Sequence, residues 1–182
     1  MTSIGSLEAR EGRSKQRYEF CPDTRATLRL VVGCVPYRWT SEDSEEGAIG
    51  LDILLINSRK HPEEWVLPKG GWETDESLED CATRETWEEA GCIGLLGDSL
   101  VRNARVSGGK QQQLHTYFAL EIVELKEAWP EVRERRRQFF PVTRARELLT
   151  AQERGKGSRT AMAAAVDILE QCCLLNRDRM VR

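Results

Sequence analysis

The chain has 182 residues, of which 40% are hydrophobic, and this size and composition predict one folded domain with a substantial core. Its formal net charge of −3 argues against a general nucleic-acid-binding protein, because such proteins present a strongly basic surface. The N-terminus lacks the apolar run of a signal peptide and no stretch reaches transmembrane length, so we expect a cytoplasmic or nuclear protein with no membrane partner.

Apolar patterning predicts a mixed α and β domain over residues 17–176, with a polar, flexible tail at 1–16 and a short tail at 177–182. Acidic residues 40–50 and the SGGKQQQ segment at 107–113 predict loops. We expect strands at 27–37, 51–56, 65–67, 92–106, 114–125 and 139–142, and helices from about 75 to 90, 143 to 150 and 159 to 175.

The first predicted helix has clear start and stop signals. Asp75 or Ser77 can cap its N-terminus with a side-chain oxygen, and Gly91 sits where helices commonly end in a left-handed turn. An apolar stripe in the first turns is continued by carboxylates at Glu85, Glu88 and Glu89, which share one side of the helix. Like charges at this spacing repel, so the helix predicts a bound cation.

Hard oxygen ligands in a small cluster suit Mg²⁺ or Mn²⁺. Zinc has little to bind, because the six cysteines form no C-x-x-C pair and the chain has two histidines. Arg84 can orient a glutamate through a two-pronged hydrogen bond. The alternative is a solvated acidic helix face, which the fixed offsets of Gly70, Glu76 and Gly91 around these residues disfavour.

The segment from Gly70 to Gly91 reads G-x5-E-x7-R-E-x-x-E-E-x-G, and this spacing resembles the signature of the Nudix hydrolases. The resemblance implies an α/β/α sandwich, with a mixed sheet, the signature helix and a C-terminal helix, and metal-dependent cleavage of an organic diphosphate. It implies Glu85 and Glu89 as metal ligands, Glu88 as general base or shared ligand, and Arg84 as their catalytic support. The main-chain carbonyl of Lys69 or Gly70 is expected to join the metal shell.

The flanking segments NSRKHPEEWVLPKGGWETDES, RETWEEAGCIG and RRRQFFPVTRARELL resemble the diphosphoinositol polyphosphate phosphohydrolases. The resemblance is closest to fungal members, which also hydrolyse diadenosine polyphosphates. Basic residues before and after the signature fit such a small, highly anionic polyphosphate substrate. The resemblance implies phosphate contacts from Arg17, Arg29, Ser58, Lys60, Lys69, Gly70, Gly71 and Lys156.

Other interpretations stay open at this stage. A Nudix enzyme of another specificity, such as removal of mRNA caps or nucleotide sanitation, would keep the chemistry and change the flanks. A catalytically silent binding protein usually lacks a signature glutamate, and all are present here. Trp65 and Trp72 could stack on an adenine or pack at the base of the loop, and inorganic polyphosphate is a further candidate substrate. We expect a monomer.

Overall fold

The computed structural model describes residues 15–40, 50–106, 112–151 and 156–180, with side chains in the last range described for residues 160–175. Most of the expected N-terminal tail and of the two expected loops lies outside these residues, as does the side chain of Lys156. Within the described ranges, no helix is both long and apolar enough to cross a membrane. The elements in chain order are β1 (Tyr18–Cys21), β2 (Ala26–Thr40), β3 (Gly50–Asn57), β4 (Trp65–Val66), β5 (Lys69–Gly71), α1 (Leu78–Ala90), β6 (Cys92–Val106), β7 (Gln113–Leu125), β8 (Arg137–Pro141), α2 (Val142–Thr150) and α3 (Lys156–Met180).

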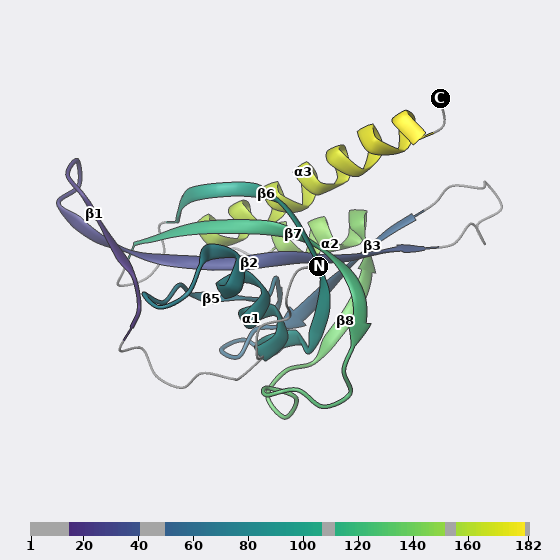
Figure 1. Ribbon diagram of the computed structural model, residues 1–182, viewed down its shortest axis with the longest axis horizontal. Coiled ribbons are helices and arrows are strands. Elements are labelled where there is room, and N and C mark those ends of the chain that lie inside the picture. The colour runs from purple at the N-terminus through teal and green to yellow at the C-terminus, as the bar shows by residue number, and fades with distance from the viewer. Residues whose placement is uncertain (1–14, 41–49, 107–111, 152–155, 181–182) are drawn as a thin grey trace.

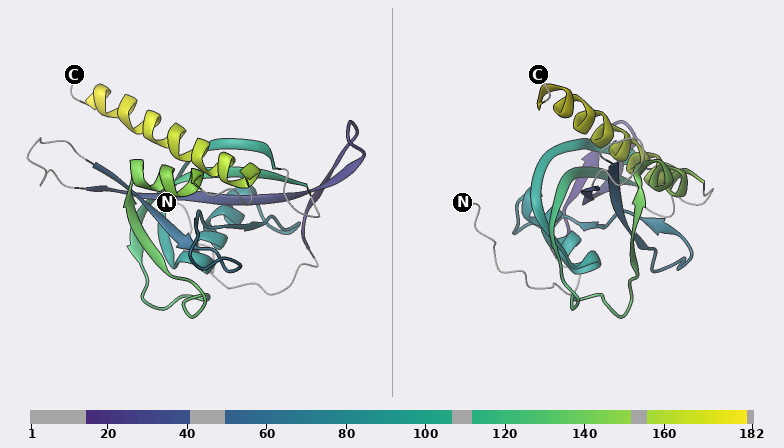
Figure 2. Two further views of the ribbon diagram at one scale, coloured as in Figure 1. Left: turned by 180° about the vertical axis from the view of Figure 1, so that it is seen from behind. Right: turned by 90° about the vertical axis from the view of Figure 1, so that its right-hand side faces the viewer.

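The strands form one mixed sheet whose central order is β4-β3-β2-β7-β6. The β2–β7 pair is parallel, whereas β2–β3, β3–β4 and β6–β7 are antiparallel. Strands β1 and β5 also pair with β2, and β8 pairs with β3. Helices α2 and α3 lie together on one face of the sheet and α1 lies on the other (Figure 1; Figure 2). The expected α/β sandwich with a mixed sheet is confirmed.

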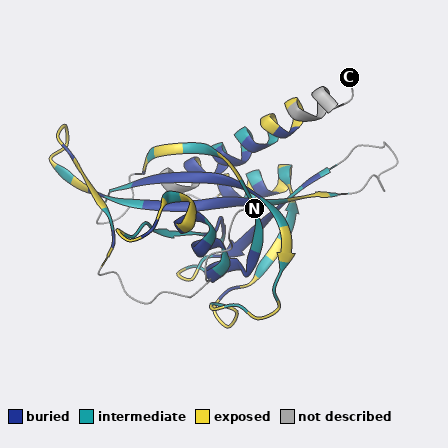
Figure 3. Cartoon of the chain, in the orientation of Figure 1, coloured by how far each residue is buried: buried dark blue, intermediate teal, exposed yellow. Residues whose placement is uncertain are grey.

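The core runs along the three central strands, where burial is nearly continuous (Figure 3). Fully buried side chains of β3 and β7, including Ile53, Leu55 and Tyr117, pack between the two helical layers. Met162, Val166 and Leu169 of α3 belong to the same cluster. This burial supplies most of the stabilisation, at about 25 cal/mol per Å² of apolar surface, and holds β2 rigidly beside α1.

Local signals for α1 act as the sequence predicts. Ser77, rather than Asp75, is the N-cap, and its hydroxyl accepts a hydrogen bond of 3.0 Å from the Asp80 N–H. Gly91 ends the helix with φ 58°, a left-handed conformation that favours glycine. Its N–H donates to the Trp87 carbonyl at 2.9 Å. The cap at Ser77 and the stop at Gly91 therefore fix both ends of the helix that carries Glu85, Glu88 and Glu89.

Three features differ from the sequence-based expectation. Strands β1 and β5 were not expected, and β5 pairs with β2 through Lys69, Gly70 and Gly71. Gln16, expected in the flexible tail, is buried and forms a bridge with Glu73. Helix α3 continues to Met180, beyond the expected domain limit at residue 176. Strands β1 and β5 and the bridge of Gln16 depend on pairing between segments distant in sequence, which local patterning does not report.

Candidate active site

Arg84 organises the carboxylates of α1. The guanidinium donates through Nε and Nη2 to both carboxylate oxygens of Glu76, at 2.9 and 2.8 Å. Nη1 donates to Glu85 at 2.8 Å and to Glu88 at 3.2 Å, and Nη2 also reaches the Gly71 carbonyl at 3.2 Å. All four charged side chains are buried. A planar fork of this kind fixes the directions of its acceptors, which a lysine could not do.

Glu89, the third carboxylate, is held by a different set of donors. The Lys69 main-chain N–H donates to its Oε2 at 2.8 Å, and Arg135 Nη2 donates to its Oε1. Arg135 is buried and also bonds the Asn57 carbonyl and Glu131, both at 2.8 Å. In the sequence, Arg135 is only one member of a basic run over residues 133–137. Within that run the signal was ambiguous, because four arginines stand within five positions.

Burial sets the protonation chemistry of this cluster. Desolvation raises the pKa of Glu85 to about 8, against the opposing charge of Arg84 and with help from neighbouring Glu89. Desolvation likewise raises the pKa of Glu89, although Lys69 and Arg135 act against it. Burial also acts to raise the pKa of Glu76, but the hydrogen bonds from Arg84 and the Glu73 N–H outweigh it and lower that pKa below its ordinary value. A cation bound beside Glu85 would therefore stabilise the charged form of its carboxylate.

Gly70 lies directly against the Glu85 carboxylate. A Cβ added at Gly70 would lie 1.9 to 2.2 Å from the three carboxylate atoms. A Cβ at Gly71 would meet the Gln16 side-chain oxygen at 1.9 Å and Arg29 Nη2 at 2.8 Å. Both glycines are therefore required by close approach of functional side chains to the β5 backbone.

These groups surround a cavity of about 350 Å³ between α1, β5 and the adjoining half of β2. Its lining consists mainly of charged and polar residues: Gln16, Arg29, Val31, Arg59, Lys69, Gly70, Gly71, Glu73, Arg84, Glu85, Glu88, Glu89, Gln113 and Glu131. The α1 side carries carboxylates, whereas Arg29, Arg59 and Lys69 contribute positive charge. The cavity can hold a cation at the α1 carboxylates and anionic groups at its basic residues, of which Arg59 also pairs with Glu131 and Glu134.

The cavity contains some of the residues expected to bind phosphate and omits others. Arg29, Lys69, Gly70 and Gly71 line it, but Ser58 and Lys60 do not. The Ser58 hydroxyl accepts from the His61 N–H at 3.3 Å, and Lys60 is exposed. Arg59, which lies between Ser58 and Lys60 in the sequence, lines the cavity instead. This loop has no regular alternation of apolar and polar residues, so the sequence did not predict which of the three side chains points into the cavity.

Arg17 hydrogen-bonds to the loop between β5 and α1 and does not line the cavity. Its guanidinium donates to the main-chain carbonyls of Glu73, Thr74 and Glu76 at 2.8, 2.9 and 3.4 Å. It also stacks on Trp72 at 4.3 Å from the ring centroid. Arg17 is absent from the cavity lining, and its expected phosphate contact would require these bonds to rearrange.

Gln16 links the same N-terminal segment to the cavity wall. Its amide donates to the Leu30 carbonyl at 2.9 Å and the Trp72 carbonyl at 3.1 Å, while its oxygen accepts from Arg29 Nε at 2.7 Å. Sequence reasoning missed this residue, because a lone glutamine after a polar tail carries no signal. Gln16 positions Arg29 toward the cavity.

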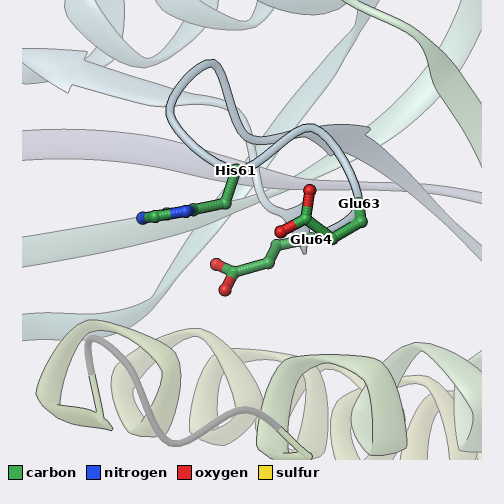
Figure 4. A group of neighbouring side chains, drawn as sticks. All are labelled: His61, Glu63 and Glu64. Carbon is green, nitrogen blue, oxygen red and sulfur yellow. The ribbon is translucent and has the colours of Figure 1, made fainter.

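A second group of possible metal ligands lies in the loop between β3 and β4. The ligand atoms of His61, Glu63 and Glu64 lie within 4.8 Å of one another, and the three side chains gather beside the loop (Figure 4). Of the three, Glu63 is exposed, His61 is half-buried and Glu64 is buried, and exposed acidic groups are common without an ion. The α1 carboxylates differ from it, because they are buried together in a cavity beside backbone that approaches closely.

Comparison with known proteins places this geometry in a family. Residues 28–161 match the NUDIX domain. The chain belongs to the Nudix family. It is 40% identical over 147 residues to Nudix hydrolase 21, chloroplastic, of Arabidopsis thaliana, covering 80% of this chain and 69% of that protein.

One further curated protein and one solved structure are also similar to the chain. The chain is 34% identical over 122 residues to diphosphoinositol polyphosphate phosphohydrolase 3-alpha of Mus musculus, covering 65% of this chain and 67% of that protein. A NUDIX hydrolase structure from Nitrosomonas europaea shares the fold with TM-score 0.59 at 15% identity, over 79% of this chain and 89% of that one. These comparisons support a Nudix hydrolase.

Nudix hydrolases generally use divalent metals such as Mg²⁺, and the donor set in this cavity fits one. Glu85, Glu88 and Glu89 offer hard oxygen ligands, and burial without a further cation disfavours the charged form of Glu85 and Glu89. These carboxylates, together with the Lys69 main-chain carbonyl, are the residues that would hold the ion. The chemistry such an ion supplies is neutralisation of phosphate oxygens and activation of water.

Proposed function

We propose that this Nudix hydrolase removes phosphate from the diphosphate group of diphosphoinositol polyphosphates, and also cleaves diadenosine polyphosphates. The observation that carries the proposal is a single cavity lined both by the buried carboxylates of α1 and by Arg29, Arg59 and Lys69. A substrate bearing many phosphates needs more cationic contacts than the scissile diphosphate itself occupies. The likeness to the mouse diphosphoinositol polyphosphate phosphohydrolase supports the same substrate class.

In the proposed reaction, water attacks the terminal phosphorus of the diphosphate. The bond from that phosphorus to the bridging oxygen breaks, and orthophosphate leaves. Glu88 takes a proton from the water, and Arg84 keeps its carboxylate directed into the cavity through the 3.2 Å contact. Arg29 and Lys69 bind the remaining phosphates and orient the substrate for attack.

Hydrolysis in the presence of Mg²⁺ tests this proposal, with orthophosphate release measured for the inositol substrate and chromatographic separation of the nucleotide products used for the other two substrates. A diphosphoinositol pentakisphosphate, diadenosine hexaphosphate and a capped RNA should be compared at equal concentration. We expect the inositol substrate and the dinucleotide to be cleaved and the capped RNA to be poor. Preference for capped RNA would retain the Nudix chemistry and overturn the substrate assignment, whereas no turnover of any substrate would favour a binding protein.

Matched variants separate the roles of the two cavity walls. Glu89→Gln should abolish turnover, while Glu79→Gln, an exposed position on the same helix, should not change it. Arg29→Gln should raise KM for the inositol substrate more than it lowers kcat. Arg38→Gln is its control, because Arg38 lies in the same strand but pairs with Asp52 outside the cavity. Full activity of Glu89→Gln would refute the assigned roles.

A further inference from the structure

Two aromatic side chains of β1 are exposed on the same face of the strand. Tyr18 is 49% and Phe20 is 62% exposed. They stand two residues apart, so they project to the same side of the sheet. Figure 3 shows β1 as mostly exposed at the end of the sheet. Exposed aromatic rings as close neighbours are costly in water, and this pair therefore calls for an explanation.

Strand register places these rings on the face of the sheet that carries the cavity. Tyr18 pairs with Arg29, and Arg29 pairs with Gln113 of β7. Laterally paired residues point to the same face, and both Arg29 and Gln113 line the cavity. Neighbouring strands lie about 4.8 Å apart, so Tyr18 stands one strand beyond the cationic wall of the cavity.

The opposite face of the same strands confirms this orientation. Cys21, Leu28 and Leu114 form a small buried cluster there, with Ala26 and Leu30 packed against it. These residues alternate with the cavity-facing ones along β1, β2 and β7. The apolar side of the β1–β2 hairpin is therefore already covered, and the aromatic side continues the cavity wall outward.

The tryptophans near the signature loop are already engaged. The Trp72 ring is covered by Arg17, and its indole N–H donates to the Glu76 carbonyl at 3.1 Å. Trp65 packs edge-on against Phe140 with centroids 5.0 Å apart. Neither of these two residues, for which stacking on an adenine or packing at the base of the loop was left open, is as exposed as Tyr18 and Phe20.

We propose that Tyr18 and Phe20 form a base-stacking subsite for the nucleoside end of a dinucleoside polyphosphate whose phosphates lie in the cavity. The inference rests on the proposed function, since it requires polyphosphate to bind beside Arg29. A flat, uncharged base joined to a chain of phosphates matches an aromatic surface that adjoins a cationic wall. An inositol ring has no π-face and gains nothing comparable from these side chains. The subsite thus selects between the two proposed substrate classes.

The test is the specificity ratio, defined as kcat/KM for diadenosine hexaphosphate divided by kcat/KM for a diphosphoinositol pentakisphosphate. Stacking energies predict that Tyr18→Ala combined with Phe20→Ala lowers this ratio by about 5- to 150-fold, mainly through KM for the dinucleotide. Tyr18→Phe combined with Phe20→Tyr keeps two aromatic rings and should preserve the ratio. Trp39→Ala removes an exposed aromatic at the other end of β2 and should leave the ratio unchanged.

An unchanged specificity ratio in the double alanine variant would overturn the subsite. An equal loss of kcat/KM for both substrates would also overturn it, because such a loss would indicate a structural role for the hairpin or a surface for a protein partner. If the wild type cleaves the inositol substrate but neither binds nor cleaves the dinucleotide, the subsite is refuted, and of the proposed function only the cleavage of diphosphoinositol polyphosphates stands. If the wild type cleaves neither, the proposed function fails. Calorimetric titration with diadenosine hexaphosphate then decides the subsite alone, through weaker binding or equal binding in the double variant.

Discussion

Gly70→Ala gives the sharpest test of the active-site geometry. The added methyl group would lie 1.9 Å from Glu85 Oε2, so the carboxylate must move by roughly 1.5 Å to reach ordinary van der Waals distance. That movement breaks the 2.8 Å bond from Arg84 to Glu85 and displaces a metal ligand. Because the displaced group is the end of a flexible side chain, the fold should survive.

We expect metal affinity in Gly70→Ala to fall about 10- to 100-fold, as for loss of a group that orients a ligand. Turnover at limiting Mg²⁺ should fall by at least as much, while the melting temperature changes by less than about 4 °C. Isothermal titration with Mn²⁺, phosphate release and calorimetric melting measure the three quantities on the same preparation.

Gly97→Ala is the matched control, because its added Cβ would meet Ala119 Cβ at 3.3 Å and nothing in the active site. It should keep both metal affinity and turnover. Wild-type metal affinity in Gly70→Ala would refute the argument that Gly70 protects the position of Glu85. Unfolding of Gly70→Ala would refute the argument that only a flexible side chain is displaced.

Three further predictions follow from buried charges. Burial raises the pKa of Glu85 to about 8, so its contribution to metal-free stability is complete below the unfolded pKa near 4.5 and is lost as pH rises through 8. In urea unfolding at pH 6 and pH 9, Glu85→Gln should remove this loss of stability. The Mn²⁺ affinity of the wild type should strengthen from pH 6 to pH 9. Burial, with the positive charges of Lys69 and Arg29 nearby, lowers the pKa of His115 to about 3, so the stability that His115 contributes above pH 6.5 is lost as pH falls. At pH 4.5 the loss in the free energy of unfolding should be about 2 to 3 kcal/mol. His115→Gln should abolish this pH-dependent loss in urea unfolding. Arg84→Lys should cost about 3 kcal/mol in urea unfolding and most of the turnover, because a lysine cannot satisfy the buried glutamates that Arg84 bonds, and near-normal values would refute its organising role.

Local spacing predicted the parts of the site that α1 carries. The cap at Ser77, the stop at Gly91 and the shared side of the three glutamates all follow from helix geometry, which is set within a few residues. The long strands β2, β3 and β7 were also predictable, because β2 and β3 are largely apolar and β7 contains the apolar run Tyr117–Leu120. The expectation of a divalent cation came from the carboxylates together with the fixed offsets of Gly70, Arg84 and Gly91, and it stays a prediction.

The remaining parts depend on contacts across the chain. Strand β5 forms because Gly33 of β2 lets Pro68 and Lys69 approach, where a Cβ would lie 2.4 Å from the Pro68 carbonyl oxygen. Arg135 reaches Glu89 across 46 positions. Arg17 has the charge of a phosphate ligand, but loop carbonyls already use its donors. Charge and composition identify such residues as candidates without fixing their partners.

Lys15, Gln16 and Arg17 hydrogen-bond to residues of the loop between β5 and α1. These contacts bear on where a minimal catalytic fragment can begin and end. The family match starts at residue 28 and stops at residue 161. A protein trimmed to those limits would keep every signature glutamate, yet it would lose the glutamine that orients Arg29 and the salt bridge from Lys15 to Asp75. It would also lose the buried α3 residues beyond position 161. Fragments intended for activity should therefore retain residues 15–27 and α3.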